Sequence, residues 1–339
     1  MGTVQGELGQ VEAVTLTPTT ADRILGCLKG IATGDAIGKQ TETLSPEDVL
    51  GWYPDGVRGF EGEPDTVIPR YAGNTKHRWR VGETTDDTER TLAVARAIVA
   101  ERSGSHATVG RELLRCAKSV HPGVRSLWEF HQAADPLRIA NDHDGCGAAI
   151  RVAPVGILYT SKRLDDLVDG AREASISTHG GSLAIAAAAA TAAAVSAAID
   201  AASSDQVLEL AERAAAQAES RWPGRSAPAL ARAIRSVHDS LACLPHLEPA
   251  EAAARWFPNQ PMTVVPLALG LATTMRSAEE AILLAANIGG DSDSVGSIAG
   301  GILGALYPWT VNQHWYDVVE RINAHDLAAV ASALTPLRR

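Results

Sequence analysis

Two short acidic segments carry the strongest chemical signal in the sequence. Residues 84–89 read TTDDTE, and residues 289–294 read GGDSDS. A pattern with helical spacing follows each segment, so both place carboxylates at a helix start, where the helix dipole favours negative charge. Carboxylate and hydroxyl oxygens with no neighbouring His or Cys are typical ligands of Mg²⁺, Mn²⁺ or Ca²⁺ rather than zinc. The two segments therefore predict a site for hard cations.

Helix capping is the competing interpretation of each segment. Asp, Ser and Thr are preferred N-cap residues, and acids are frequent in a first turn. A cap needs one oxygen, however, whereas each segment supplies two carboxylates and a hydroxyl. Gly289 and Gly290 would also clear side chains from the approach to Asp291. Because the four aspartates carry four negative charges, two divalent cations would balance them.

The composition predicts an all-α fold in a single domain. The chain has 339 residues, of which 45% are hydrophobic and only 4% aromatic. A core of Ala and Leu favours closely packed helices over a sheet. One helix is expected from Thr19 or Thr20 toward Gly38 and another from Thr85. Further helical patterns cover about 110–119, 148–159, 163–174, 182–200, 205–219, 227–241, 248–255, 262–274, 278–287, 294–306 and 314–333.

Three segments lack this periodicity. Residues 1–18 are expected to be a disordered leader before a helical domain over 19–339. Residues 41–84 are rich in Gly, Pro and Asp, with a short helix expected after Ser45. Irregular segments of that length inside a domain are often functional. Residues 135–147 form a second polar loop.

Charge and cysteine content favour a cytoplasmic protein with a small or protein-borne ligand. The net charge is −10 and no basic block is present, so we expect neither a nucleic-acid partner nor a membrane surface. The four cysteines form no CxxC pair, which suits a reducing compartment. No signal peptide is expected, and the Ala-rich residues 183–199 are better explained by a buried helix than by a membrane span.

Several motifs in fixed order resemble those of the ADP-ribosylglycohydrolase family. GCLKG at 26–30 and GDAIG at 34–38 are followed by Glu42, then by the TDDT and GGDSDS segments. The family includes dinitrogenase-reductase-activating glycohydrolases and the ADP-ribosyl hydrolases of animals. The matching blocks span about residues 21–307. The resemblance implies an orthogonal helical bundle around a binuclear metal site, with two Mg²⁺ as cofactors and Mn²⁺ as the alternative.

Site residues follow from the resemblance by motif position. Glu42 is implied as a catalytic acid or base and Asp291 as a further catalytic residue, while Asp35 is implied in a supporting role. The implied metal ligands are Thr85, Asp86, Asp87, Asp291, Asp293 and Ser294. Ser294 stands where relatives often have Thr and keeps the hydroxyl.

The implied substrate contacts come from two loops and the Gly289–Gly290 pair. The segment GCGAAIR resembles a family loop in which Asn stands at the position of Cys146, and it supplies Gly145, Cys146, Gly147 and Arg151. His179, in STHG, resembles a histidine near the ligand. Arg151 is equally explained as a buried ion-pair partner, and His179 as a capping or core residue.

The resemblance implies hydrolysis of the ribosyl C1 glycosidic bond in an ADP-ribosylated protein or a related compound. A small nucleoside or ribosyl metabolite is the alternative substrate, which the Cys146 replacement and the long segment 41–84 allow. Two-metal phosphoester hydrolysis is disfavoured because no His lies in either acidic segment. A non-catalytic ADP-ribose-binding protein is the remaining alternative. The sequence does not indicate an oligomeric state.

Overall fold

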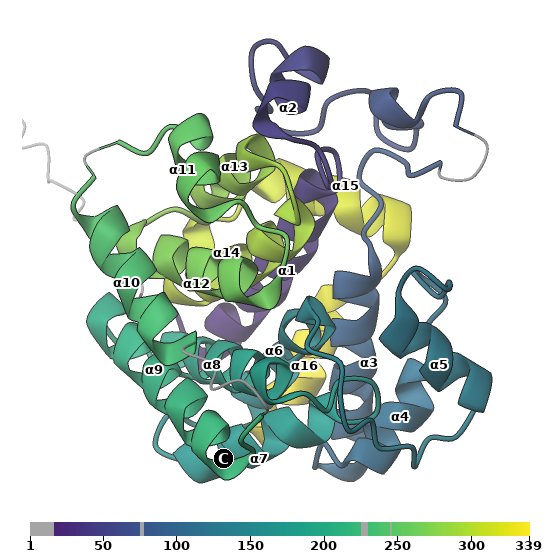
Figure 1. Cartoon of the computed structure of the whole chain (residues 1–339), viewed down its shortest axis with the longest axis vertical. Helices are drawn as coiled ribbons and strands as arrows, with labels where there is room; N and C mark the ends of the chain where they lie inside the picture. The colour runs from purple at the N-terminus through teal and green to yellow at the C-terminus, as the bar shows by residue number, and fades with distance from the viewer. Residues whose placement is uncertain (1–16, 75–77, 225–229, 245) are drawn as a thin grey trace, which may run out of the picture.

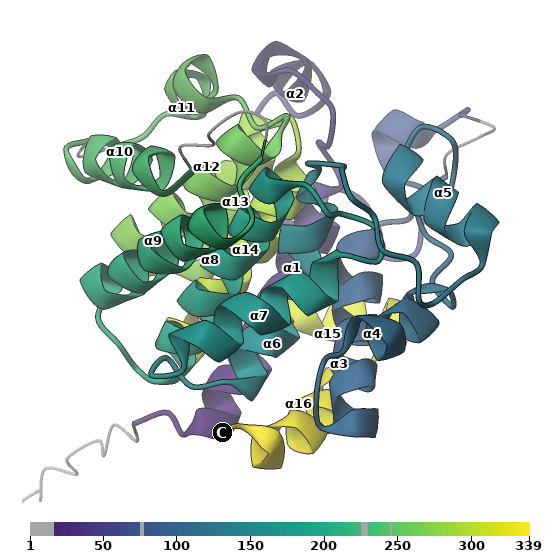
Figure 2. The ribbon, with the colours of Figure 1, turned by 60° about the horizontal axis from the view of Figure 1, so that its bottom comes forward.

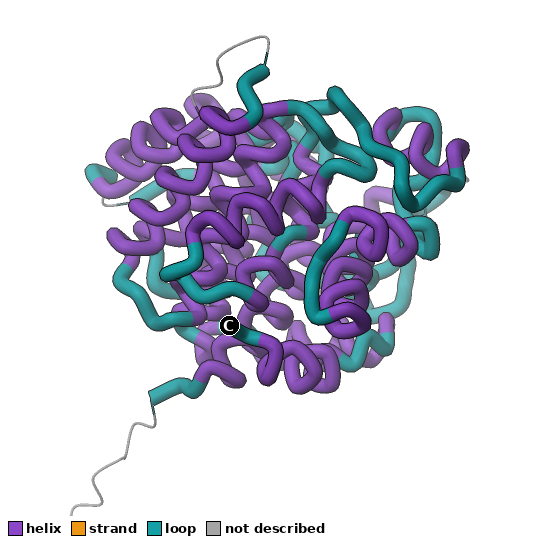
Figure 3. Tube along the Cα trace, turned by 90° about the horizontal axis from the view of Figure 1, so that it is seen from below, coloured by secondary structure: helices purple, strands orange, loops and turns teal. Residues whose placement is uncertain are grey.

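The computed structural model describes residues 17–74, 78–224, 230–244 and 246–339, and these form an all-α protein (Figures 1 and 3). Within them, extended residues pair only at an isolated bridge between Val67 and Arg80. The α-helices are α1 (Thr20–Gly38), α2 (Pro46–Trp52), α3 (Asp86–Glu101), α4 (His106–Leu113), α5 (Arg125–Ala133), α6 (Ala153–Leu158), α7 (Leu164–Ser175), α8 (Ser182–Ile199), α9 (Ser204–Arg221), α10 (Leu230–Ala242), α11 (Pro249–Trp256), α12 (Pro261–Thr274), α13 (Ala278–Ile288), α14 (Ser292–Leu306), α15 (Gln313–Asn323) and α16 (Leu327–Leu334). Short 3-10 turns are η1 (Pro69–Tyr71), η2 (Cys146–Arg151), η3 (Pro308–Thr310) and η4 (Thr335–Leu337).

Helices α1 and α14 pair at the centre of the bundle, backbone against backbone (Figure 1). Glycines recur every four residues along the contact, at positions 26, 30, 34 and 38 of α1 and at 296, 300 and 304 of α14. A Cβ on Gly30 would lie 2.0 Å from the Gly300 carbonyl oxygen, so no larger residue fits the present spacing. This pairing sets the C-terminal end of α1 beside the start of α14.

The other helices surround this central pair. Helix α14 also contacts α8, α12 and α13, whereas α1 contacts α3, α15 and α16. The view of Figure 2 shows α7, α8 and α9 running across the front of the bundle. Helix α8 is mostly alanine, and these small side chains let α9 pack closely against it. It is the one helix of the described ranges long and apolar enough to cross a bilayer, and 94% of it is buried inside the protein.

Most predicted helices are present, but three predictions were wrong in detail. The helix expected over 314–333 is two helices, because Ala324 and Asp326 both take positive φ angles and break it. The helix expected over 110–119 is α4, which begins and ends earlier, and the short α5 was not foreseen. The pattern over 148–159 divides into η2 and α6.

The long segment between α1 and α3 lies at the top of the view in Figure 1. The short helix expected after Ser45 is confirmed as α2, with the Ser45 hydroxyl accepting a hydrogen bond from the Asp48 amide. The other described residues of this segment, 39–45, 53–74 and 78–85, are irregular except for η1. Of the leader predicted over 1–18, residues 1–16 lie outside the described residues.

Candidate active site

The first acidic segment is fixed to α1 by Asp35. This aspartate is fully buried on α1, and its carboxylate accepts hydrogen bonds from the Thr85 amide (2.9 Å) and from the Thr88 amide and hydroxyl (3.1 and 2.5 Å). Burial raises the pKa of Asp35 to about 6, and the Thr88 and Thr85 hydrogen bonds oppose that rise. Thr85 is the N-cap of α3 and accepts a hydrogen bond from the Asp87 amide. Asp35 therefore orients the start of α3.

The second acidic segment is held by the backbone of two loops. The Gly290 amide donates to the Leu44 carbonyl and the Asp291 amide donates to the Pro258 carbonyl, at 2.9 and 2.7 Å. Gly289 and Gly290 have φ angles of 78° and 66°, which favour glycine, and a Cβ on either would lie within 2.4 Å of those carbonyl oxygens. Backbone conformation and packing thus explain both glycines. They do not line the cavity described next, so the structure gives no support to their predicted substrate contact.

Both acidic segments face one cavity of about 240 Å³. Five carboxyl groups line it, against one guanidinium group, that of Arg90. Its other walls come from the 145–147 loop and from the residues near α5 and His179. The full lining is Glu42, Asp86, Asp87, Arg90, Ser119, Val124, Ser126, Gly145, Cys146, Gly147, Ile150, His179, Asp291, Asp293 and Ser294. Among the predicted metal ligands, all but Thr85 therefore share the cavity.

Each ionised carboxyl group of this cavity makes ionisation of its neighbours less favourable. Burial, followed by the neighbouring carboxylates Asp35, Asp86 and Asp291, raises the pKa of Asp87 well above its usual value. Burial and the Glu42 carboxylate likewise raise the pKa of Asp293 well above its usual value. Oδ2 of Asp87 is buried and accepts no hydrogen bond from the residues that the structure describes. A buried carboxylate oxygen without a donor is costly, so the site is suited to a positively charged partner.

The Asp86 carboxylate has two partners among the other residues that line the cavity. Its carboxylate pairs with Arg90 at 2.7 Å and accepts a hydrogen bond from the Ser119 hydroxyl at 2.5 Å. Within the described ranges, no three His, Cys, Asp or Glu side chains converge on a common point as metal ligands do. Neither Arg90 nor Ser119 was singled out from the sequence. The i,i+4 spacing of Asp86 and Arg90 could have indicated that pair, whereas nothing in the local pattern marks Ser119.

Glu42 reaches the cavity from the turn after α1 and is paired with Lys39. The Lys39 ammonium group donates a hydrogen bond to a Glu42 carboxylate oxygen and lies 4.4 Å from the centre of the Trp79 ring. The Lys39 side chain is only 7% exposed, against 28% for Glu42. Lys39 was not predicted as a site residue either, although it lies between two motifs that were recognised.

The 145–147 loop packs against His179. A Cβ on Gly147 would lie 2.7 Å from the His179 ring and would displace it, whereas a Cβ on Gly145 would lie 3.0 Å from the ring and would crowd it. Burial and the nearby Arg151 and Arg90 lower the pKa of His179 well below its usual value, which keeps the imidazole neutral. Burial and the charge of Asp291 raise the pKa of the Cys146 thiol well above its usual value. Gly145, Cys146, Gly147 and His179 line the same cavity as the acids.

Arg151 lies beneath the site instead of in it. It is fully buried, and its guanidinium group donates to the carbonyls of Gly147, Ala174 and Ser175 and to the Thr178 hydroxyl. It does not line the cavity. The structure therefore supports the structural interpretation of Arg151, with hydrogen bonds to carbonyls in place of the expected ion pair, and gives no support to direct substrate contact.

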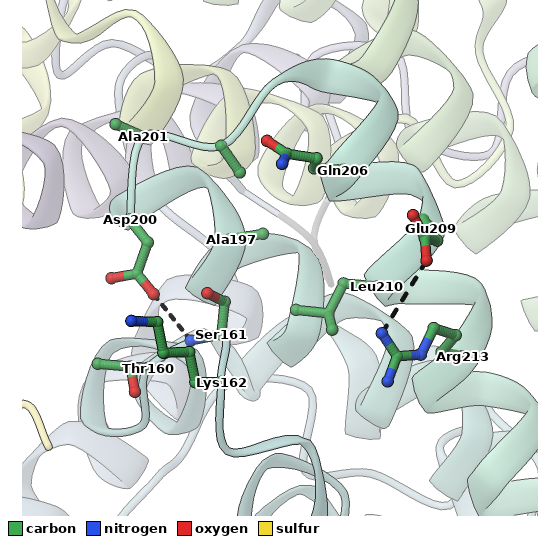
Figure 4. Close-up of a pocket in the computed structure, with 11 residues that line it drawn as sticks. Thr160, Ser161, Lys162, Ala197, Asp200, Ala201, Gln206, Glu209, Leu210 and Arg213 are labelled. Carbon is green, nitrogen blue, oxygen red and sulfur yellow. Dashed lines mark hydrogen bonds and ion pairs between the residues drawn. The ribbon is translucent and has the colours of Figure 1, made fainter.

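A larger hollow of about 770 Å³ lies elsewhere, between the turn before α7 and helices α8 and α9 (Figure 4). Two pairs of its polar groups contact each other: the Asp200 carboxylate accepts from the Ser161 amide at 2.8 Å, and Arg213 lies 4.0 Å from Glu209. This open surface lacks the facing carboxylates of the smaller cavity, so its chemistry is less distinctive.

The fold is an all-α bundle, and the site brings acids from two helix starts to one cavity. Together these features define a narrow class of protein, and the sequence comparison identifies the same class. The profile of the ADP-ribosylglycohydrolase family matches residues 16–339, and the chain belongs to this family. The predicted family and all-α fold class are confirmed.

Individual relatives are distant. The chain is 28% identical to the uncharacterized protein YegU of Escherichia coli strain K12, over 94% of this chain and 98% of that one. It is 25% identical to the ADP-ribosylarginine hydrolase Tri1 of Pseudomonas putida, over 92% of this chain and 80% of the relative. A solved ADP-ribosylglycohydrolase-related protein complex has a similar fold, with a TM-score of 0.66, 24% identity, and 94% and 99% of the two chains covered.

Proposed function

We propose that the protein is a metal-dependent glycohydrolase that cleaves the C1 glycosidic bond of ribose in an ADP-ribosylated protein or a related ADP-ribosyl compound. The observation that carries this proposal is the single cavity that five carboxyl groups line. Cleavage at C1 passes through an oxocarbenium-like state, whose positive charge carboxylates stabilise. The similarity to an ADP-ribosylarginine hydrolase supports the substrate class.

The donor set of the cavity fits hard divalent cations. Oxygen donors dominate it, and one buried carboxylate oxygen of Asp87 has no hydrogen-bond donor among the described residues. Two Mg²⁺, or Mn²⁺ in their place, would polarise the ribose hydroxyls that they bind and fix the sugar. Of the predicted ligands, those that line the cavity and would hold the cations are Asp86, Asp87, Asp291, Asp293 and Ser294, while Thr85 caps α3 beside them.

The other residues of the cavity have separate roles in this proposal. Glu42 acts as the acid or base, either by orienting the water or by protonating the leaving group. Backbone amides of the 145–147 loop hold phosphate or base, because glycines let a ligand approach the main chain. Neutral His179 supports this loop by packing against both glycines.

The Asp291→Asn variant tests the proposal. Removing one negative charge from the cavity should reduce turnover by about 100-fold or more while the chain still folds. Release of ADP-ribose from a modified protein measures turnover, and far-UV circular dichroism measures folding. Wild-type turnover in this variant would refute the assignment.

Glu42→Gln separates chemistry from metal binding. Turnover should fall about 10²- to 10⁴-fold, as expected on loss of a general acid or base, while Mg²⁺ still binds. Single-turnover kinetics and calorimetric Mg²⁺ titration are the measurements. An unslowed Glu42→Gln variant would remove Glu42 from the mechanism.

A smaller ribosyl substrate is the second candidate, and the cavity size favours it. The cavity holds about 240 Å³, below the roughly 300–1,000 Å³ typical of pockets for drug-sized ligands. A whole ADP-ribosyl group would therefore extend beyond it, past the 145–147 loop. Comparing ADP-ribose release from modified protein with ribose release from nucleosides distinguishes the two substrates.

A further inference from the structure

The side chain of Lys39 is a fixed cation at the edge of the acidic cavity. Lys39 is the C-cap of α1, where the helix dipole favours positive charge, and its amide donates to the Asp35 carbonyl at 2.9 Å. Its own carbonyl accepts a hydrogen bond from Arg70 at 3.1 Å. The backbone of Lys39 is therefore anchored on both sides.

The Lys39 ammonium group faces acids on one side and an aromatic wall on the other. It donates a hydrogen bond to Glu42, and a Cβ on the preceding Gly38 would lie 2.5 Å from the Asp293 Cα. Burial lowers the pKa of Lys39, but the charges of Asp293 and Glu42 outweigh burial and raise that pKa above its usual value. The Trp79 ring covers the ammonium group at 4.4 Å, and Lys118 lies at 5.5 Å from the centre of the same ring. Buried at 7% exposure, the ammonium group has little water to screen its charge.

These contacts give one cation two opposite effects on the site. The ammonium group orients the Glu42 carboxylate, because this buried cation needs that carboxylate as its hydrogen-bond partner. It also repels any divalent cation that binds beside Asp293, because like charges a few ångströms apart interact strongly where water is excluded. We propose that Lys39 is a positioning residue that holds Glu42 in place and, as a fixed charge beside Asp293, weakens the binding of divalent cation on that side of the cavity. This inference rests on the proposed metal-dependent function.

Calorimetric titration of metal-stripped protein with Mn²⁺ tests the inference. In Lys39→Met, the weaker Mn²⁺ binding should tighten by about tenfold or more, because the repulsion is lost. Turnover at saturating Mn²⁺ should nevertheless fall, because Glu42 loses its partner. Lys39→Arg, which keeps the charge, should retain affinity close to that of the wild type. A purely structural role would instead weaken binding and turnover together.

Lys29→Met is the matched control. Lys29 lies on the same helix, with its ammonium group 4.2 Å from the Tyr316 ring and hydrogen-bonded to Gln313, away from the cavity. Its Mn²⁺ affinity and turnover should be unchanged. If Lys39→Met does not fold, as judged by circular dichroism, Lys39→Gln replaces it.

The outcomes separate this inference from the proposed function. Unchanged or weaker Mn²⁺ binding in the Lys39→Met or Lys39→Gln variant would overturn the inference and leave the glycohydrolase assignment standing. Absence of Mn²⁺ binding from both the wild type and the variants would overturn both. Tighter binding with lower turnover in Lys39→Met, and not in Lys39→Arg or Lys29→Met, would support the inference.

Discussion

His325 supports the candidate active site from behind the first acidic segment. Its Nε2 lies 2.8 Å from the Thr84 hydroxyl, one residue before the N-cap of α3. Burial, together with the charges of Lys118 and Arg96, lowers the pKa of His325 to about 4. In the unfolded chain its pKa is about 6.5. The folded state therefore binds this proton less readily than the unfolded state does.

His325 should make the protein less stable in acid. A depressed folded-state pKa contributes stability that is present above about pH 6.5 and is lost as the pH falls toward 4. Between pH 7.5 and pH 5 this single group accounts for about 2 kcal/mol of the free energy of unfolding. Urea denaturation of the wild type and of His325→Gln at both pH values measures it. Equal pH dependence in the two proteins would contradict the assignment.

At the scale of elements, the α1–α14 contact determines where the acids lie. A Cβ on Gly34 would lie 2.1 Å from the Gly296 carbonyl oxygen, and one on Gly38 would lie 2.5 Å from the Asp293 Cα. The same contact continues into the site, where the Ser292 hydroxyl donates to the Gly38 carbonyl at 2.8 Å. Close approach of these two helices is thus a condition for the geometry of the cavity.

Gly30→Ala should force the central helices apart. Because the added methyl group would meet the Gly300 backbone at 2.0 Å, we expect a loss of about 3 kcal/mol or more in the free energy of unfolding. Gly51→Ala is the control: Gly51 lies in α2, and a Cβ added there would have nothing within 4 Å, so this variant should be neutral or up to about 1 kcal/mol more stable. Denaturant unfolding measures both. Equal stability of the two variants would show that the helix contact tolerates expansion.

At the scale of the whole molecule, the cavity joins segments far apart in the chain. Glu42, Asp86, Cys146 and Asp291 all line it. A cation bound there would link these segments only in the folded protein. Binding to the folded state alone raises stability by mass action.

Added Mg²⁺ should therefore raise the melting temperature, and chelator should lower it and remove activity. At a free concentration 100 times the dissociation constant, the gain is about 2.7 kcal/mol. Thermal unfolding with Mg²⁺ and with EDTA measures the effect, and Asp87→Asn, which removes a carboxylate of the cavity, should reduce the Mg²⁺ response. A melting curve and activity that chelator leaves unchanged would count against a metal site.

The sequence by itself was enough to predict the helical class and the two acidic segments. Helical periodicity and Ala-rich composition depend on local spacing, so α8 and most other helices were foreseen. Motif order identified the family, and the positions of Asp86, Asp87, Asp291 and Asp293 followed from it. The local sequence pattern predicted helix boundaries less well where the backbone conformation of a single residue sets the boundary. One example is Ala324, whose positive φ angle separates α15 from α16.

Only the tertiary structure decided which residues face the cavity and which support it. Lys39 and Arg90 pair with acids three and four residues away in the chain, whereas Ser119 contacts Asp86 from a separate segment, and only the structure shows that these contacts border one cavity. Arg151, expected near the substrate, instead binds carbonyls beneath the 145–147 loop. Burial and partner choice depend on how the helices pack, because a side chain's electrostatic environment is set by all the elements around it.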